Sequence, residues 1–233
     1  ATLLKAGHEV VGRIDVSQVI DSNTDVSISR AEDLETMENI ADIIMDFSNP
    51  SLTDQILSYA RRTSTPLLSG TTNMTEAQHE KLVDLGNHIP VIWASNYSLG
   101  INLFMHILPQ VSKTLEDWDI EIVETHHNKK VDSPSGTAKS LADAIDPNGE
   151  YKRVYGREGN CGERTKKEIG LHAIRGGNVT GEHTVGFYGT DEVFEITHKA
   201  VSRQILVDGA IKAATKLVTR EAGYYNMDRL IFD

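Results

Sequence analysis

The sequence predicts an α/β protein of two domains, in which a doubly wound parallel sheet precedes an α+β domain with a mixed open sheet. As far as residue 98, short apolar runs alternate with helical patterns of roughly ten to fifteen residues, which is typical of right-handed β-α-β crossovers. Beyond residue 98 the rhythm changes. A long helical pattern comes first, and three alternating runs separated by turn residues follow later, which indicates antiparallel strands.

The first domain opens on the end of an amphipathic helix, which Gly7 terminates. Apolar runs predict strands, and a 3.6-residue spacing predicts helices, with Pro50 suited to an early helical turn. The predicted strands cover residues 9–15, 40–46, 66–70 and 89–95, and the predicted helices cover residues 50–64 and 75–87.

The second domain combines two further helices with one mixed sheet. Residues 147–168 are polar and rich in glycine, so they are predicted to form a loop. The remaining predicted elements are a helix at 100–117, a strand at 118–127, a helix at 135–145, antiparallel strands at 169–177, 180–189 and 191–201, and a final helix at 209–223.

Composition excludes several classes of protein. The net charge of −11 and the pI of about 5.3 oppose a nucleic-acid partner, because phosphates are neutralised by clustered Lys and Arg. No apolar run approaches the roughly 18 residues of a membrane helix. A single cysteine, Cys161, and the lack of a secretory leader at the start of the sequence lead us to expect a cytoplasmic protein.

Two adjacent histidines end the strand at 118–127. Alternation predicts Ile120, Ile122 and Thr125 on one side, and Glu121 and Val123 on the other. Neighbouring residues of an extended chain face opposite sides, so His126 and His127 are poorly placed to bind one metal ion. No metal site is expected.

The loop that follows runs into a helix at Ser135, Gly136 and Thr137. The first amides of a helix lack internal partners and carry the positive end of the dipole, so this turn can hold a carboxylate or phosphate. Ordinary capping by Ser135 is the alternative interpretation. The nearby His126 and Lys130 favour chemistry on a small anion, because they can exchange protons beside it.

The stretch "ETHHNKKVDSPSGTA", residues 124–138, resembles the signature of the dihydrodipicolinate reductase family, also called 4-hydroxy-tetrahydrodipicolinate reductases. The similarity extends over the whole chain. Further matching segments are "DFSNP" at 46–50, "SGTT" at 69–72, "ASNYSLGIN" at 94–102, "RGGNVTGEHTVGF" at 175–187 and "EITHKAVSR" at 195–203.

The resemblance implies a Rossmann-like cofactor domain at 1–98, a substrate-binding and oligomerisation domain at 99–206, and a C-terminal return to the cofactor domain at 207–233. It implies that His126 is the proton donor and Lys130 the second proton-handling residue. His127, Ser135, Gly136 and Thr137 match the substrate-carboxylate site. The cofactor-binding matches are Gly70, Thr71, Thr72, Ala94, Ser95, Asn96 and Tyr97.

The expected cofactor is NADH or NADPH. Asp15, at a strand end, can accept hydrogen bonds from both adenosine-ribose hydroxyls and repel a 2′-phosphate, which favours NADH. Val16 and Asn49 stand where NADPH-preferring members tend to place Arg, although Arg13 offers a nearby base.

The resemblance further implies reduction of a cyclic dicarboxylate to tetrahydrodipicolinate in diaminopimelate and lysine biosynthesis, and a homotetramer. Family members begin with a strand and a Gly-rich phosphate turn, so we expect such residues before residue 1. The string of Gly156, Gly159 and Gly162 is not expected to replace that turn, because a charged segment precedes it. The alternative function is a non-catalytic dicarboxylate-binding or assembly protein that lacks the cofactor grip.

Overall fold

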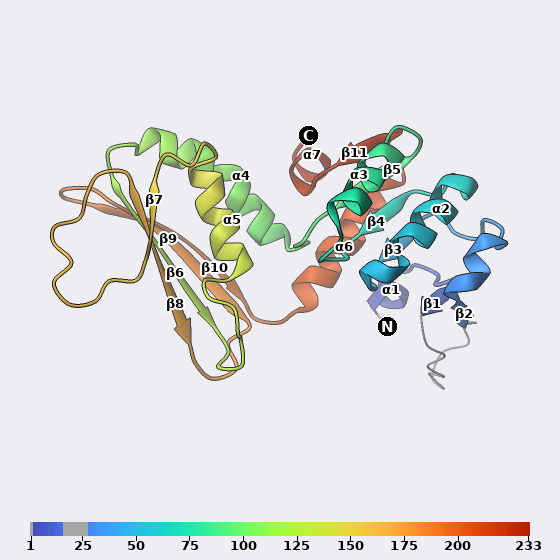
Figure 1. The fold of residues 1–233 in the computed structure, drawn as a ribbon, viewed down its shortest axis with the longest axis horizontal. Coiled ribbons are helices and arrows are strands. Elements are labelled where there is room, and N and C mark those ends of the chain that lie inside the picture. The colour runs from blue at the N-terminus through green and yellow to red at the C-terminus, as the bar shows by residue number, and fades with distance from the viewer. Residues whose placement is uncertain (1, 16–27) are drawn as a thin grey trace. The chain divides into compact units, whose positions relative to one another are not determined.

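The computed structural model describes residues 2–15 and 28–233, and leaves the side chains of residues 13–32 out of that description. The chain divides into two compact units. The first unit comprises the described residues of Ala1–Ser98 together with Leu206–Asp233, and the second unit comprises Leu99–Ile205. Each unit has its own strands and helices (Figure 1), and each has its own hydrophobic core.

The first unit is built on parallel strands, which confirms the predicted α/β class. Four of them form one sheet in the order β11-β5-β4-β3, and β1 and β2 form a separate parallel pair. The strands are β1 (Arg13–Asp15), β2 (Ile28–Arg30), β3 (Ile44–Asp46), β4 (Leu67–Ser69), β5 (Pro90–Trp93) and β11 (Gly223–Tyr225).

Helices lie between successive parallel strands along the chain, as β-α-β crossovers require, and two further helices precede β1 and follow β11. The helices are α1 (Thr2–Lys5), η1 (Ala31–Glu35), η2 (Pro50–Leu52), α2 (Thr53–Thr63), α3 (Glu76–Leu85), α6 (Gln204–Leu217) and α7 (Met227–Ile231). Apolar residues of α2 and α3 pack on Leu67 and Val91 of the sheet. Leu68 and Ile92, which alternate with them, are also fully buried, so both faces of the sheet are covered.

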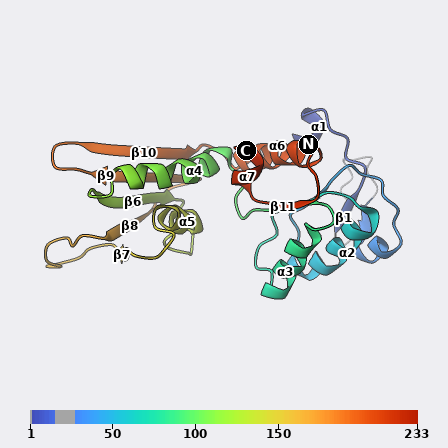
Figure 2. The ribbon, with the colours of Figure 1, turned by 90° about the horizontal axis from the view of Figure 1, so that it is seen from above.

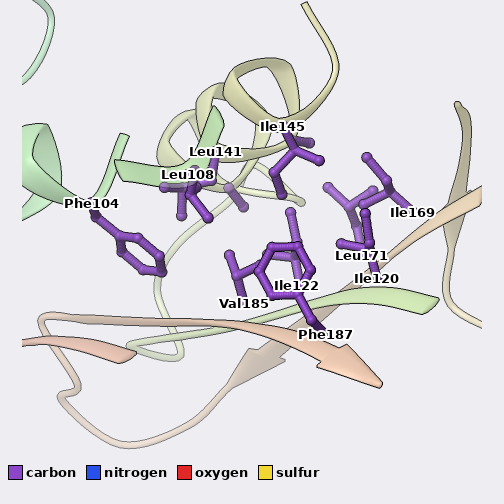
Figure 3. Packing of buried hydrophobic residues seen from close by; sticks show 12 residues of the cluster. Phe104, Leu108, Ile120, Ile122, Leu141, Ile145, Ile169, Leu171, Val185 and Phe187 are labelled. Carbon is purple, nitrogen blue, oxygen red and sulfur yellow. The ribbon is translucent and has the colours of Figure 1, made fainter. Parts of the chain in front are cut away.

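The second unit holds a five-stranded mixed sheet. Its strands are β6 (Asp119–His126), β7 (Lys152–Tyr155), β8 (Glu168–Arg175), β9 (Gly181–Tyr188) and β10 (Val193–Ala200), and its helices are α4 (Leu99–Thr114) and α5 (Gly136–Ile145). Figure 2 shows the strand order β10-β9-β6-β8-β7. The helices contribute Leu108 and Leu141 to a core with Ile122, Val185 and other strand residues (Figure 3).

Two predictions for this sheet were wrong. The polar segment 147–168 contains a strand, β7, which pairs in parallel with β8 at the sheet edge. Edge strands tolerate charged side chains such as Lys152, which is why its composition suggested a loop. The second error concerns β8, which is parallel to β6 and not hydrogen-bonded to β9, because β6 lies between them.

Two element starts also differ from the prediction. The first strand spans only Arg13–Asp15, because its ladder with β2 extends over three residue pairs. Helix α6 begins at Gln204, well before the predicted residue 209, and the Ser202 hydroxyl accepts a hydrogen bond from the Gln204 amide at 3.0 Å. Gly209, at which we placed the helix start, lies buried inside α6.

Candidate active site

The carboxyl end of β6 is enclosed by a glycine turn. The chain leaves β8 at Arg175 and enters β9 at Gly181, on the other side of β6, so the connection has to cross the end of β6. Two hydrogen bonds fasten it there. The Gly176 amide donates to the His126 carbonyl at 2.9 Å, and the Asn128 amide donates to the Gly177 carbonyl at 3.2 Å. The turn needs Gly177 because its φ of 51° is unfavourable for other residues.

Strict alternation along β6 brings two chemically active side chains to the buried face. Ile120 and Ile122 point to the core, and Glu124 and His126 continue the same face. The expectation that Thr125 would join this face was wrong, because alternation from Ile122 reaches Glu124 and passes over Thr125. Glu124 is only 1% exposed and His126 is 9% exposed.

Glu124 is the centre of this site. Both carboxylate oxygens accept from Arg175, Oε1 from Nη2 and Oε2 from Nη1, each at 2.8 Å. Oε1 also accepts from the Ser135 amide at 3.0 Å, and Oε2 lies 2.5 Å from Nδ1 of His126. Burial alone would raise the pKa of Glu124, but the hydrogen bonds from Arg175, His126 and Ser135 outweigh it and hold that pKa below its ordinary value. Glu124 is therefore a carboxylate at neutral pH.

The ionised state of Glu124 fixes the proton on His126. A carboxylate only accepts hydrogen bonds, so Nδ1 of His126 must carry the hydrogen of their contact. Nε2 is then left to exchange a proton with a ligand. It lies beside Gly181, where a Cβ would stand 3.0 Å from Nε2.

The start of α5 lies beside the same carboxylate. Ser135 is the N-cap, as predicted, and its hydroxyl accepts from the Ala138 amide at 3.1 Å. Its own amide is bound to Glu124, so Ser135 positions the turn. Among the described residues, none accepts from the Gly136 amide, and nothing lies within 4 Å of a Cβ built on Gly136. Gly136 therefore leaves space for an anion at the helix start, next to Thr137.

A second histidine packs against His126. His183 of β9 is 4% exposed, and its ring stands edge-on to the His126 ring with centroids 5.2 Å apart. Its Nε2 lies 3.1 Å from the Ser135 hydroxyl. Burial, and after it the neighbouring His126, lower the pKa of His183 to about 4, so this ring is neutral at neutral pH.

Lys130 and His127 lie in the loop between β6 and α5. The ammonium of Lys130 is 2.8 Å from Asp132, and the exposed fractions of these side chains are 21% and 53%. His127 is half-buried, and its side chain has no hydrogen-bond partner among the described residues. Both residues follow His126 closely along the chain.

In the first unit, the predicted cofactor loops are organised by a buried carboxylate that sequence reasoning did not single out. Asp46, at the end of β3, is 5% exposed. Its Oδ1 accepts from the amide and hydroxyl of Ser48 at 3.0 and 2.6 Å, and its Oδ2 accepts from the hydroxyls of Ser69 and Thr71, each at 2.9 Å. Asp46 thus joins the loops that follow β3 and β4.

Aromatic residues support these loops. Tyr97 is 2% exposed, its hydroxyl donates to the Ser69 carbonyl at 2.7 Å, and burial raises its pKa. The Trp93 indole donates to the Thr71 carbonyl at 2.8 Å. The ring of Phe47 lies 57% exposed over Gly70, where a Cβ would stand 2.3 Å from it.

The other predicted cofactor residues follow β1, β4 and β5. Thr72 and Ser95 are exposed, Ala94 is half-buried, and the Asn96 side chain accepts from the Ser98 amide at 2.8 Å. Asp15 is the last residue of β1, and its side chain lies outside the described part of the structure. Val16 also falls outside it.

Within residues 2–15 and 28–233, no group of three or more His, Cys, Asp or Glu side chains gathers around a point that could hold a metal ion. None of the helices in this part of the chain combines the length and the apolar character that crossing a membrane requires.

The fold and these two sites define a two-domain α/β protein of the dehydrogenase and reductase class. Family models described as "Dihydrodipicolinate reductase, N-terminus" and "Dihydrodipicolinate reductase, C-terminus" match residues 1–97 and 100–231. The chain therefore belongs to the dihydrodipicolinate reductase family, as the resemblance in the sequence indicated. Members of this family are oxidoreductases of diaminopimelate and lysine biosynthesis that use NADH or NADPH.

Individual proteins agree with this assignment. The 4-hydroxy-tetrahydrodipicolinate reductase of Nitratiruptor sp. is 42% identical over 95% of this chain and 89% of the relative, and that of Brachyspira hyodysenteriae is 43% identical over 93% and 94%. The fold resembles a dipicolinate-bound dihydrodipicolinate reductase from Paenisporosarcina sp. TG-14, with a TM-score of 0.76 and 21% identity over 96% of this chain and 89% of that one.

Proposed function

We propose that this chain catalyses the NAD(P)H-dependent reduction of 4-hydroxy-tetrahydrodipicolinate to tetrahydrodipicolinate. The observation that carries the proposal is the pairing of buried His126 with ionised Glu124 beside the open helix start at Gly136. A proton donor and a carboxylate site within one cluster are what reduction of a cyclic dicarboxylate requires. The names of the relatives supply the substrate.

The residues of the first unit fit a nicotinamide cofactor. Ligands of doubly wound sheets bind at the carboxyl ends of the strands, and there the loops after β3 and β4 are held together by Asp46. The exposed ring of Phe47 above Gly70 offers an apolar surface to a planar ring. The residues that would hold the cofactor are Gly70, Thr71, Thr72, Ala94, Ser95, Asn96 and Tyr97, with Asp15 at the adenosine ribose. When bound, the cofactor supplies the hydride.

The second unit binds the substrate and supplies the proton. The Gly136 and Thr137 amides and His127 would bind one carboxylate, and the charge of Lys130 would attract the dianion. Overall, the substrate loses water and gains one hydride and one proton. His126 would take up a proton from solvent on Nε2, keeping its other hydrogen on Nδ1 against Glu124, and this imidazolium would deliver the Nε2 proton to the ring atom left electron-rich by the hydride, with help from Lys130.

NADH is the expected cofactor of the two. The side chain at position 15 is a carboxylate, which accepts hydrogen bonds from ribose hydroxyls and repels a 2′-phosphate. Asn49, where an Arg would favour NADPH, is instead the N-cap of η2, and its side chain accepts from the Ser51 amide.

A cytoplasmic homotetramer is the expected form of the enzyme. The strands β8 and β10 expose Ile174, Val193 and Phe194 by 51%, 55% and 45%, so the sheet offers apolar surface to another copy. The exposed single Cys161 is compatible with a reducing compartment. Light scattering after size exclusion would give the mass of the assembly, and a stable monomer of 25.7 kDa would contradict the tetramer.

An absorbance assay tests the function. The purified protein should oxidise NADH at 340 nm only when 4-hydroxy-tetrahydrodipicolinate is added, and pyridine-2,6-dicarboxylate should inhibit competitively. The rival function, a dicarboxylate-binding protein without catalysis, would bind the pyridine dicarboxylate in calorimetry without any oxidation of NADH. That outcome would overturn the proposal.

A further inference from the structure

The carboxylate of Glu124 has a role beyond its ion pair with Arg175. We propose that Glu124 is a positioning residue for His126, that it fixes the hydrogen on Nδ1 so that Nε2 alone faces the substrate, and that Gly181 keeps the space at Nε2 open. This inference rests on the proposed function and names two residues that the family comparison does not assign.

The contact at Nδ1 of His126 supports the positioning role of Glu124. Nδ1 of His126 and Oε2 of Glu124 are 2.5 Å apart, and both residues lie on the buried face of β6, two positions apart. A neutral imidazole can carry its hydrogen on either nitrogen, and the partner of one nitrogen decides which. An acceptor that cannot donate selects the tautomer with hydrogen on Nδ1.

Two neighbours, Arg175 and Ser135, keep Glu124 in place as an acceptor. Arg175 binds both oxygens in a planar fork, and the Ser135 amide binds Oε1. Arg175 is itself held by the carbonyls of Ile174 and Asp132, each at 2.8 Å. The carboxylate therefore cannot rotate away from His126 without breaking contacts on both oxygens.

The surroundings of Nε2 of His126 support the role of Gly181. Gly181 is the first residue of β9 and lies beside this nitrogen, and a methyl group on it would stand 3.0 Å from Nε2, closer than ordinary van der Waals contact. The Gly181 φ does not lie in the left-handed region, so alanine is compatible with the backbone. The absent side chain therefore keeps the proton-exchanging nitrogen accessible.

The same strand provides a matched control for a test. On its other face, Glu121 is bound by His172 at 2.7 Å and by Arg157 at 3.0 and 2.9 Å, and it also contacts Arg164. Glu121 thus repeats the glutamate, histidine and arginine arrangement on the face of β6 opposite His126. Glu121→Gln should disturb the fold as Glu124→Gln does, but it should spare the chemistry.

The test combines kinetics with the nitrogen-15 spectrum of the histidine rings, in which the His126 signals are assigned by their loss in His126→Gln. Glu124→Gln should lower kcat by about 100-fold with KM changed less than about threefold, and should shift the neutral His126 ring from the Nδ1–H toward the Nε2–H tautomer. Glu124→Asp, which keeps the charge, should recover part of kcat. Gly181→Ala should lower kcat without changing the tautomer.

Two results would overturn the inference. One is an unchanged His126 tautomer in Glu124→Gln, and the other is an equal loss of kcat in Glu121→Gln and Glu124→Gln at matched thermal stability. The spectrum is independent of turnover. If the wild-type protein reduced no substrate while its His126 tautomer still depended on Glu124, the proposed function would fail and the positioning contact would stand.

Discussion

The guanidinium of Arg175 contacts both carboxylate oxygens of Glu124, with each nitrogen 2.8 Å from its oxygen. The two residues come from neighbouring strands, β8 and β6, so the ion pair connects the sheet at the place where the glycine turn crosses it. Because Glu124 is 1% exposed, its charge needs this partner. The pair therefore links the stability of the second unit to its candidate site.

Replacing Arg175 by Lys should destabilise the protein by about 1–3 kcal/mol, because a lysine cannot satisfy both oxygens in one plane. The loss of stability caused by Arg175→Lys should become smaller as pH falls. Glu124 has a lowered pKa in the folded state, so its contribution is present above the ordinary value of 4.5 and disappears as the folded protein takes up the proton. Urea unfolding at pH 7 and near pH 4 measures both effects. Arg61→Lys, in an exposed pair with Asp84, should change stability by less than about 0.5 kcal/mol.

His183 should make the fold sensitive to acid. Its pKa is about 4 when folded and 6.5 in the ordinary state, so between these values the unfolded chain binds a proton that the folded chain does not. The free energy of unfolding should therefore be retained above pH 6.5 and fall by about 3 kcal/mol from this residue as pH drops toward 4. In His183→Gln the new side chain does not titrate, so the free energy of unfolding should depend less steeply on pH. Equal slopes in the two proteins would show that His183 is not the cause.

Asp46→Asn should weaken cofactor binding and leave the structure of the second unit unchanged. The amide nitrogen of Asn would face hydroxyl or amide donors of Ser48, Ser69 or Thr71, so part of the junction between the two loops would be lost. We expect KM for NADH to rise about 10-fold and stability to fall by about 1–3 kcal/mol. Asp54→Asn is the control, because Asp54 forms an exposed pair with Lys81. Unchanged KM for NADH in Asp46→Asn would contradict a cofactor role for these loops.

Cofactor choice tests the assignment of Asp15. The wild-type kcat/KM should be higher with NADH than with NADPH. Asp15→Ala should reduce this preference, the kcat/KM with NADH divided by the kcat/KM with NADPH, by about tenfold, since it removes hydrogen bonds to the ribose and the repulsion of a 2′-phosphate. The same variant should leave KM for the dicarboxylate unchanged. A preference for NADPH in the wild type would contradict the assignment.

Much of the fold follows from periodicity. The strands at Ile44, Leu67 and Val91 and the helices between them were predicted because their apolar patterns are long and interrupted by clear turn signals. Strand β7 was missed, because an edge strand can be as polar as a loop. Strand β8 was predicted to be antiparallel but pairs in parallel with β6 and β7, because sequence order does not reveal that β6 is inserted between β8 and β9.

The candidate site was predicted only in part, because sequence order does not reveal which strands are neighbours in the sheet. His126, Lys130 and the Ser135 turn are close in sequence, and their motif is visible as one segment. Arg175, Gly181 and His183 reach the site through strand pairing, with His126 opposite Arg175 and Glu124 opposite His183. One signal for Glu124 was available, because alternation from Ile120 and Ile122 leads to it. Asp46 ends a predicted strand, but its hydroxyl partners on a neighbouring loop could not be foreseen.

The most direct measurement is the steady-state reduction of 4-hydroxy-tetrahydrodipicolinate by the wild-type protein and by His126→Gln, followed at 340 nm. Without the proton donor, kcat should fall by about 10²–10⁴-fold while KM changes little, because the carboxylate site at Gly136 and Thr137 is intact. His172→Gln, on the opposite face of the same sheet, should retain its turnover. Equal kcat in the wild-type protein and His126→Gln would remove His126 from the chemistry and contradict the mechanism.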